Sequence, residues 1–308
     1  MILGENRQEN PKNEGMPSLL SFTLSCYYLL LAQVISFKTA HYIICLRRDD
    51  LFNGKGKHGR SNYLGKLRAT STSRMEYVLY DSGENPAVAS LTGILNESKS
   101  EVDSPHAQEN AETGIGVEDR GSSMSGAPPL RKDLGVIVYN FDKSAQKTGA
   151  RRMEVAIPQV QGSDKDSKPV LWQPRDAKGS IRSNFGRVRY QGAQNSLLTE
   201  RIFVMHQRES RYDPLSSCLV DFRGRATSAS VKNFQLIKSP PADNATRVRY
   251  YSEGSGKGEN DSDEYPRPVL LQMGKVGKNC FNVDVLWPLS LFQAFAICLS
   301  RFDTHAQF

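Results

Sequence analysis

The chain has 308 residues, 38 % of them hydrophobic, which is enough for a globular core in one large domain or two small ones. Lys and Arg outnumber Asp and Glu by 40 to 33, and the net charge of +7 suits nucleic acid, an anionic membrane or no particular partner. Five scattered cysteines without a C-x-x-C pair argue against a disulfide scaffold and a zinc site, and favour a reducing cytosolic or nuclear setting.

The N-terminal region divides into a polar tail and an apolar stretch. Residues 1–17 are expected to form a short disordered tail, and Ser18–Phe37 is apolar but interrupted by several polar side chains. The stretch predicts a pair of buried strands. A membrane-inserted segment is the alternative, although the flank is acidic as well as basic and no small-residue cleavage site follows.

A basic pair comes next, in Gly65-Lys66-Leu67-Arg68. On a strand, Lys66 and Arg68 point to one face and could converge on one anion, while Leu67 turns into the core and Gly65 would allow close approach of a bulky headgroup. The same spacing of two arginines recurs at positions 187 and 189, 223 and 225, and 247 and 249. Spacing alone therefore fits a solvated strand face equally well.

Short runs of alternating apolar and polar residues predict many further strands. They include residues 75–80, 152–157 and 281–287. Turn residues separate these runs and no long helical pattern stands between them, so the pattern favours an antiparallel sandwich or barrel over alternating βαβ units.

Two polar inserts interrupt the strands, at residues 96–129 and 239–265. Both lack apolar periodicity and are expected to be disordered. Residues 96–119 carry a charge of −6 and residues 240–265 a charge of −3, so the net charge without these two segments rises from +7 to +16. The remaining body should present a positive field to an acidic partner.

The C-terminal segment Pro288–Leu299 is the exception to the strand pattern. It is apolar around nearly its whole circumference and has Pro where a first helical turn tolerates it, so it predicts a helix. At ~1.5 Å per residue this helix is too short to cross a bilayer of ~30 Å. Its expected place is the centre of a mainly β body.

This segment lies in a stretch that resembles a known family. DFRGRATSASVKNFQ and PLSLFQAFAICLSRFD resemble the carboxyl-terminal signature of tubby-like proteins. Upstream, KTAHYIICL, SNYLGKLR, YDSGENP, LRKDLGVIVYNF and GARRMEVAIP resemble strands of the same family in the same order. The resemblance implies a Tubby C-terminal-like domain over residues 18–308, folded as a closed antiparallel barrel of about twelve strands around its C-terminal helix.

The resemblance also implies a binding site. In tubby-like proteins the lysine and arginine of GKLR coordinate phosphatidylinositol 4,5-bisphosphate, and these are Lys66 and Arg68 here. A further headgroup ligand of the family matches Arg131, and a polar position that is usually Asn or Asp matches His41. The charge of His41 would depend on pH, and a plain surface histidine is an equally good interpretation.

Two departures from the family pattern affect these expectations. The basic run that commonly precedes the K-T motif is replaced by LLLAQVISF, and ATSTSRM follows GKLR in place of the usual S-N-F-L-G-T-K-F. We therefore expect weaker long-range attraction to the membrane than is usual for the family, and the N-terminal strands are the least secure part of the predicted barrel.

The function predicted is a phosphoinositide-binding module, without cofactors and monomeric, that tethers peripherally to the cytoplasmic face of the plasma membrane. It could act as an adaptor for protein cargo in membrane-protein or ciliary trafficking. The alternative is a nuclear transcription regulator that binds nucleic acid through its basic surface. No nucleophile motif, H-E-x-x-H, Walker motif or dinucleotide fingerprint is present, and the chain is not expected to be an enzyme.

Overall fold

The computed structural model describes twelve segments of the chain. They are residues 2–6, 19–24, 27–36, 39–52, 62–85, 131–141, 151–161, 170–172, 180–191, 201–208, 221–239 and 268–303. The chain divides into two compact units, one formed by Met1–Asp81 with Asp133–Phe308 and the other by Ser82–Lys132. The insert at 96–129 lies outside the described residues, and so does the insert at 239–265 except for its first residue. The expected disorder of both inserts therefore stays a prediction.

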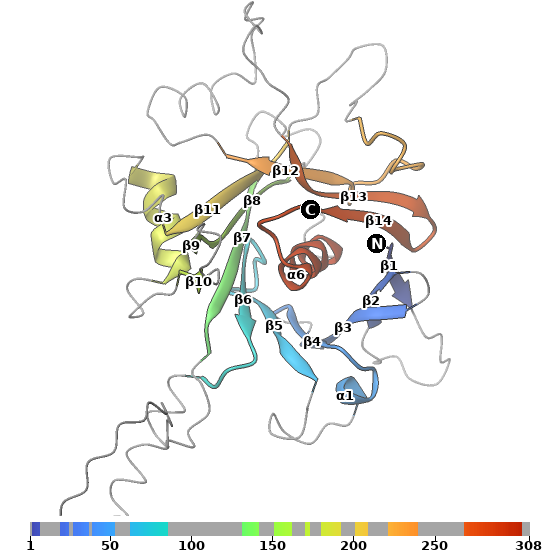
Figure 1. The fold of residues 1–308 in the computed structure, drawn as a ribbon, viewed down its shortest axis with the longest axis horizontal. Helices are drawn as coiled ribbons and strands as arrows, with labels where there is room; N and C mark the ends of the chain where they lie inside the picture. The colour runs from blue at the N-terminus through green and yellow to red at the C-terminus, as the bar shows by residue number, and fades with distance from the viewer. Residues whose placement is uncertain are drawn as a thin grey trace, which may run out of the picture. The chain divides into compact units, whose positions relative to one another are not determined.

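The larger unit is one antiparallel sheet curved around a helix (Figure 1). Ten of its strands are β3 (Tyr27–Ser36), β4 (His41–Cys45), β5 (Tyr63–Ala69), β6 (Glu76–Asp81), β7 (Asp133–Phe141), β8 (Arg151–Pro158), β11 (Ile202–Gln207), β12 (Phe234–Lys238), β13 (Val269–Gly277) and β14 (Cys280–Val285). Two more, β1 (Ile2–Asn6) and β2 (Leu19–Leu24), stand between β14 and β3 and pair with them, so the strand order closes into a barrel. The mainly β, antiparallel fold predicted from the alternation is confirmed.

The N-terminal strands differ from the expected tail. Ile2–Asn6 pairs with β2 and with β14, and Leu3 is fully buried in the core. The prediction of a disordered tail over residues 1–17 is therefore wrong for Ile2–Asn6, because the apolar side chain of Leu3 is part of the barrel interior. The apolar stretch Ser18–Phe37 provides β2 and β3, as the prediction of two strands required. None of the described helices is both long enough and apolar enough to cross a membrane.

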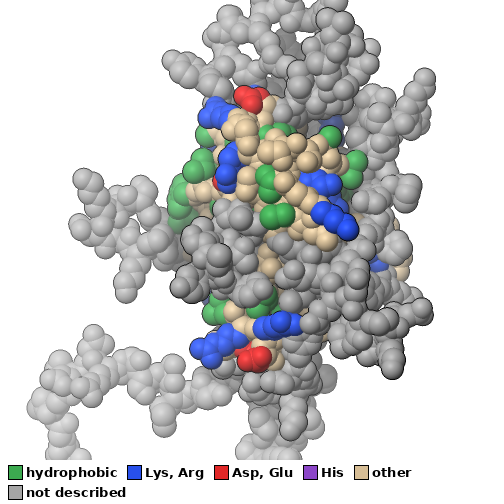
Figure 2. Space-filling view, turned by 90° about the vertical axis from the view of Figure 1, so that its right-hand side faces the viewer, with side chains coloured by type: hydrophobic (Ala, Val, Ile, Leu, Met, Phe, Trp, Pro, Cys, Tyr) green, Lys and Arg blue, Asp and Glu red, His purple; other side chains and the backbone are tan. Residues whose placement is uncertain are grey.

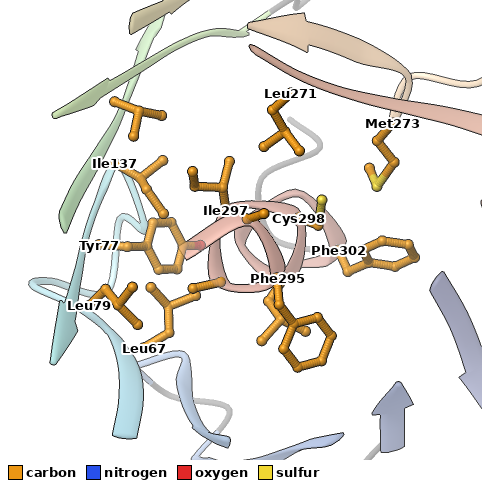
Figure 3. Packing of buried hydrophobic residues seen from close by; sticks show 14 of the residues in the cluster. Leu67, Tyr77, Leu79, Ile137, Leu271, Met273, Phe295, Ile297, Cys298 and Phe302 are labelled. Atoms are coloured by element: carbon orange, nitrogen blue, oxygen red, sulfur yellow. The ribbon is translucent and has the colours of Figure 1, made fainter. Parts of the chain in front are cut away.

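Helix α6 (Leu291–Phe302) runs through the barrel, as predicted for the apolar C-terminal segment. It starts three residues later than Pro288, because Ser290 forms a capping box with Gln293 and so satisfies the first backbone N–H groups. Residues from Gln293 to Ser300 are all buried. Figure 3 shows Phe295, Ile297, Cys298 and Phe302 pointing toward side chains of the surrounding strands. The circumference that looked too apolar for a surface helix is therefore buried on every side.

Polar contacts fix both ends of α6. At the end where the helix begins, here called the start rim, Gln293 donates to the backbone oxygen of Leu134 at 2.9 Å, next to the first residue of β7. At the opposite end, the end rim, Arg74 in the β5–β6 turn forms a buried ion pair with Asp303. Tyr77 also donates to Asp303, at 2.7 Å, and its pKa is raised, first by burial and then by this carboxylate.

Two short helices cover parts of the outer face of the barrel. Helix α1 (Asp49–Phe52) contacts β3 and β4, and helix α3 (Ile181–Gln191) contacts β7, β8 and β11. A small separate sheet joins β9 (Val160–Gln161) and β10 (Val170–Leu171). Helix α3 was not anticipated. Only Ile181 and Phe185 supply its described buried apolar contacts, one turn apart, which is too short a pattern to recognise in the sequence.

Candidate anion-binding site

Lys66 and Arg68 point outward from β5. Leu67 and Ala69, the alternate residues, are buried in the barrel interior, so the period of two places both cations on the outer face, as predicted. Arg68 is exposed and Lys66 is partly buried. Their Cα atoms are about 7 Å apart at the usual strand rise, a separation that long basic side chains can close on a single anion.

The neighbouring strands add two side chains to this face. His41, the first residue of β4, lies directly opposite Arg68, and Tyr80 of β6 lies directly opposite Lys66. Directly opposed residues have Cβ atoms about 4.5–5.5 Å apart. The structure therefore brings together three of the four predicted residues, Lys66, Arg68 and His41.

Tyr80 is a site residue that sequence reasoning missed. The Nζ atom of Lys66 lies 5.7 Å from the centroid of the Tyr80 ring, within the range of a cation–π contact. This contact restrains a long flexible side chain before any ligand arrives. The alternation of residues 75–80 indicated that Tyr80 faces outward, but only the register of β5 with β6 places it beside Lys66.

The outward face of β5, which carries Lys66 and Arg68, lies between two clusters of apolar side chains on the outside of the barrel. One cluster, on β3, β4 and the start of β5, contains Leu31, Ile43, Cys45, Leu51 and Tyr63 next to α1. The other contains Val78 and Tyr80 of β6 with residues of β7, β8, β11 and α3. Lys66 and Arg68 thus form a polar strip bordered by side chains with low affinity for water, and we call it the β5 strip.

Charges close to the β5 strip favour an anion. Among the residues that the structure describes, Arg68 forms no ion pair with a carboxylate. Glu76 shares the outward face of β6 with Val78, the partner of Arg68, but it is neutralised by an ion pair with Arg182 of α3. The guanidinium of Arg68 therefore remains available for a ligand.

Gly65 has a different role from the one predicted. Its φ is +154°, and a Cβ at this position would overlap the backbone oxygen of Tyr80 and lie 2.9 Å from Cζ of Phe292. The missing side chain thus permits close approach of β6 and α6, not of a ligand on the outer face. The sequence thus indicated correctly that this position needs a glycine, but the close neighbours are β6 and α6 and not the predicted headgroup.

Arg131 belongs to the second unit, Ser82–Lys132. Within that unit its backbone N–H donates to the oxygen of Glu84 at 2.7 Å, and its guanidinium donates to Asn85 at 3.4 Å. Its convergence with Lys66 and Arg68 on one ligand stays a prediction.

Other paired arginines are in settings unlike the β5 strip. Arg187 lies on helix α3, so its spacing from position 189 does not place both on one strand face. Arg223 has a positive φ of 49° in a turn, and Arg225 is held by Asp284 through two hydrogen bonds of 2.8 and 2.7 Å. This contact lowers the pKa of Asp284 below its usual value. Neither of these two arginine pairs therefore lies on a strand with both side chains on one face.

Basic side chains are also found on another face of the molecule. Figure 2 shows the side of the molecule at the right of Figure 1, where Lys and Arg are more prominent than Asp and Glu among the described residues. In the segments that could be searched, no group of three or more His, Cys, Asp or Glu side chains is placed to hold a metal ion.

Comparison with known proteins supplies a family. The model described as "Tub family" matches residues 22–304. The human protein named Tubby-related protein 1 is 28 % identical over 267 residues, covering 86 % of this chain and 35 % of that protein. Two proteins of Arabidopsis thaliana, Tubby-like F-box protein 11 and Tubby-like F-box protein 6, are 29 % and 38 % identical, over 85 % and 94 % of this chain. The chain spans 59 % and 61 % of the lengths of these two plant relatives.

Proposed function

Because the chain belongs to the Tub family, we propose that it binds the headgroup of phosphatidylinositol 4,5-bisphosphate at the β5 strip and so attaches to the cytoplasmic face of the plasma membrane. The observation that carries this proposal is the position of Lys66 and Arg68 on one outward face, with His41 directly opposite Arg68. Three nitrogen-bearing side chains on adjacent strands suit a ligand with several phosphates.

Each residue has a separate part in binding. The guanidinium of Arg68 can donate two parallel hydrogen bonds to one phosphate, whereas the ammonium of Lys66 acts as a point charge that the Tyr80 ring positions. His41 donates a hydrogen bond to a neighbouring phosphate, more strongly when it is protonated. Arg131 is proposed as a further ligand from the family motif alone.

The physiological role follows from the chemistry of the ligand. A module held by a bisphosphate headgroup leaves the membrane when a phospholipase removes that headgroup. The amount of membrane-bound protein would therefore follow the amount of intact bisphosphate lipid. We propose that the chain is a monomeric binding module and not an enzyme, and that it could carry protein cargo in membrane-protein or ciliary trafficking. The F-box in the names of the plant relatives describes those proteins.

Vesicle binding tests the proposal. Lys66→Ala with Arg68→Ala removes two charge-assisted contacts, each worth roughly 1.5–3 kcal/mol, so affinity for bisphosphate-containing phosphatidylcholine vesicles should fall by a factor of about 100 or more. The matched control is Arg208→Ala with Lys278→Ala, which removes the same charges from two exposed positions, one directly after β11 and one in the turn between β13 and β14. Each of these charges should be worth about 1 kcal/mol or less.

Two results would contradict the headgroup site. The first is an equal loss in both double variants that moderate salt also abolishes, which would indicate only a diffuse basic surface. The second is salt-sensitive binding to duplex DNA that soluble inositol trisphosphate does not compete for, which would favour nuclear nucleic-acid binding through the wider basic surface.

A further inference from the structure

One carboxylate lies within reach of the β5 strip. The outward residues of β5 and β6 form adjacent pairs along the two strands: Arg68 lies opposite Val78, and Thr70 lies opposite Glu76, whose backbone oxygen accepts from the Thr70 N–H at 2.9 Å. Arg68 and Glu76 are therefore diagonal neighbours. Such neighbours are about 7–8 Å apart, a separation that long side chains span. Glu76 is thus a natural competitor of an anionic ligand for the guanidinium of Arg68.

Arg182 of helix α3 holds this carboxylate. Its Nε atom forms an ion pair with Oε1 of Glu76, and its Nη2 atom donates to Oε2 at 3.3 Å. Helix α3 contacts β7, which is the neighbour of β6 on the side opposite β5, so the ion pair draws the carboxylate away from Arg68. The Glu76 side chain is only 25 % exposed, and the pair is therefore less screened by water than a fully exposed one.

The backbone that carries Arg182 is fixed on both sides. Ile181, which precedes it, is fully buried in an apolar cluster that also contains Val78 of β6. The hydroxyl of Ser180 accepts from the backbone N–H of Ser183 at 3.2 Å, as a capping residue does at the start of a helix. The packing of α3 against the barrel thus sets where the guanidinium of Arg182 can lie.

We propose that Arg182 is a positioning residue of the headgroup site, because its ion pair with Glu76 keeps the guanidinium of Arg68 available to phosphate. The inference rests on the proposed function and adds to it a residue outside the β5 strip. Without Arg182, the Glu76 side chain pairs with Arg68, and an incoming phosphate must first displace it. An exposed ion pair of this kind lowers the affinity for the competing ligand up to about fivefold.

A double-mutant cycle tests this role. The affinity for soluble inositol trisphosphate is measured by isothermal titration calorimetry at about 0.15 M salt, where the field of distant charges is largely screened. Arg182→Ala should weaken binding about threefold, and Arg182→Lys should restore most of the loss. Glu76→Gln should strengthen binding less than about twofold in the parent, but it should recover the full loss in the Arg182→Ala background.

The matched control is Arg187→Ala, which removes the same charge from an exposed position of the same helix and should leave the affinity unchanged. An equal loss in Arg182→Ala and Arg187→Ala would indicate a general field effect. A loss that Glu76→Gln does not recover would indicate a damaged helix, and either result overturns the proposal.

The same titrations separate this inference from the proposed function. An Arg182→Ala variant that binds as tightly as the parent would overturn the role of Arg182 and leave the headgroup site standing. A parent chain that does not bind the trisphosphate, or that binds it equally well after Lys66→Ala with Arg68→Ala, would overturn the headgroup site and this inference with it.

Discussion

The ion pair at the end rim makes the sharpest stability prediction. Asp303 and Arg74 are each only 3 % exposed, and they join the end of α6 to the β5–β6 turn. Asp303→Ala would leave the Arg74 guanidinium buried without its carboxylate and the Tyr77 hydroxyl without its acceptor. Removing one partner of a buried pair typically costs about 3–5 kcal/mol, a large part of a total stability of about 5–15 kcal/mol.

A double variant separates the charge from the packing. Arg74→Met with Asp303→Leu removes both charges, so it should cost only about 1–3 kcal/mol, mainly for the unsatisfied Tyr77 hydroxyl. The positive φ of Arg74, 53°, costs Arg and Met alike and cancels from the comparison.

Urea unfolding followed by circular dichroism gives the free energies of unfolding for the parent, Asp303→Ala, the two single variants Arg74→Met and Asp303→Leu, and the double variant that combines these two. The coupling energy from this cycle should be large, because the two residues are in direct contact. A loss below about 1 kcal/mol for Asp303→Ala, or a double variant as unstable as the sum of the singles, would refute the reasoning.

Three further predictions concern backbone space and buried ionisable groups. Gly65→Ala should lower the free energy of unfolding by about 2 kcal/mol or more in urea, since its Cβ would overlap a backbone oxygen of β6; an unchanged midpoint would show that β5 can shift without cost. Burial raises the pKa of Tyr77 and Tyr139 above that of unfolded tyrosine, so their stabilising contribution is complete below about pH 10 and is lost as the pH rises further. Unfolding free energies measured from neutral to alkaline pH should show this fall, and Tyr77→Phe should lessen it. Burial also raises the pKa of the Cys298 thiol, so a thiol reagent should label it only after unfolding, and labelling of the native protein faster than unfolding would contradict this.

The elements that sequence reasoning predicted are those with a strong local pattern. The alternation at residues 75–80 and 152–157 became β6 and β8, within a residue or two at each end. The run at 281–287 became β14 but stops at Val285, so Trp287 is exposed instead of continuing the alternation. The apolar circumference of the C-terminal segment was enough to place α6 inside the sheet.

The candidate site was predictable only in part. Period two on a strand is enough to place Lys66 and Arg68 together, but the side chains beside them depend on strand register, which a single sequence does not reveal. Tyr80 was missed and Gly65 was misassigned for this reason. The pair Arg74 and Asp303 is separated by 229 positions, and no local pattern links them.

The position of α6 in the chain constrains how the protein can fold. Every strand of the barrel precedes the helix in sequence, yet the interiors of β5, β6 and β7 pack against it. During synthesis the ribosome exposes all of these strands before their common core element exists, so the nascent sheet has an apolar interior with nothing to fill it. Contacts between α6 and strands more than 150 residues earlier can form only after the helix has been synthesised, and contacts of such long sequence separation make folding slow. A truncation that removes α6 would therefore leave the whole interior of the sheet unfilled and would be as damaging as the loss of a domain.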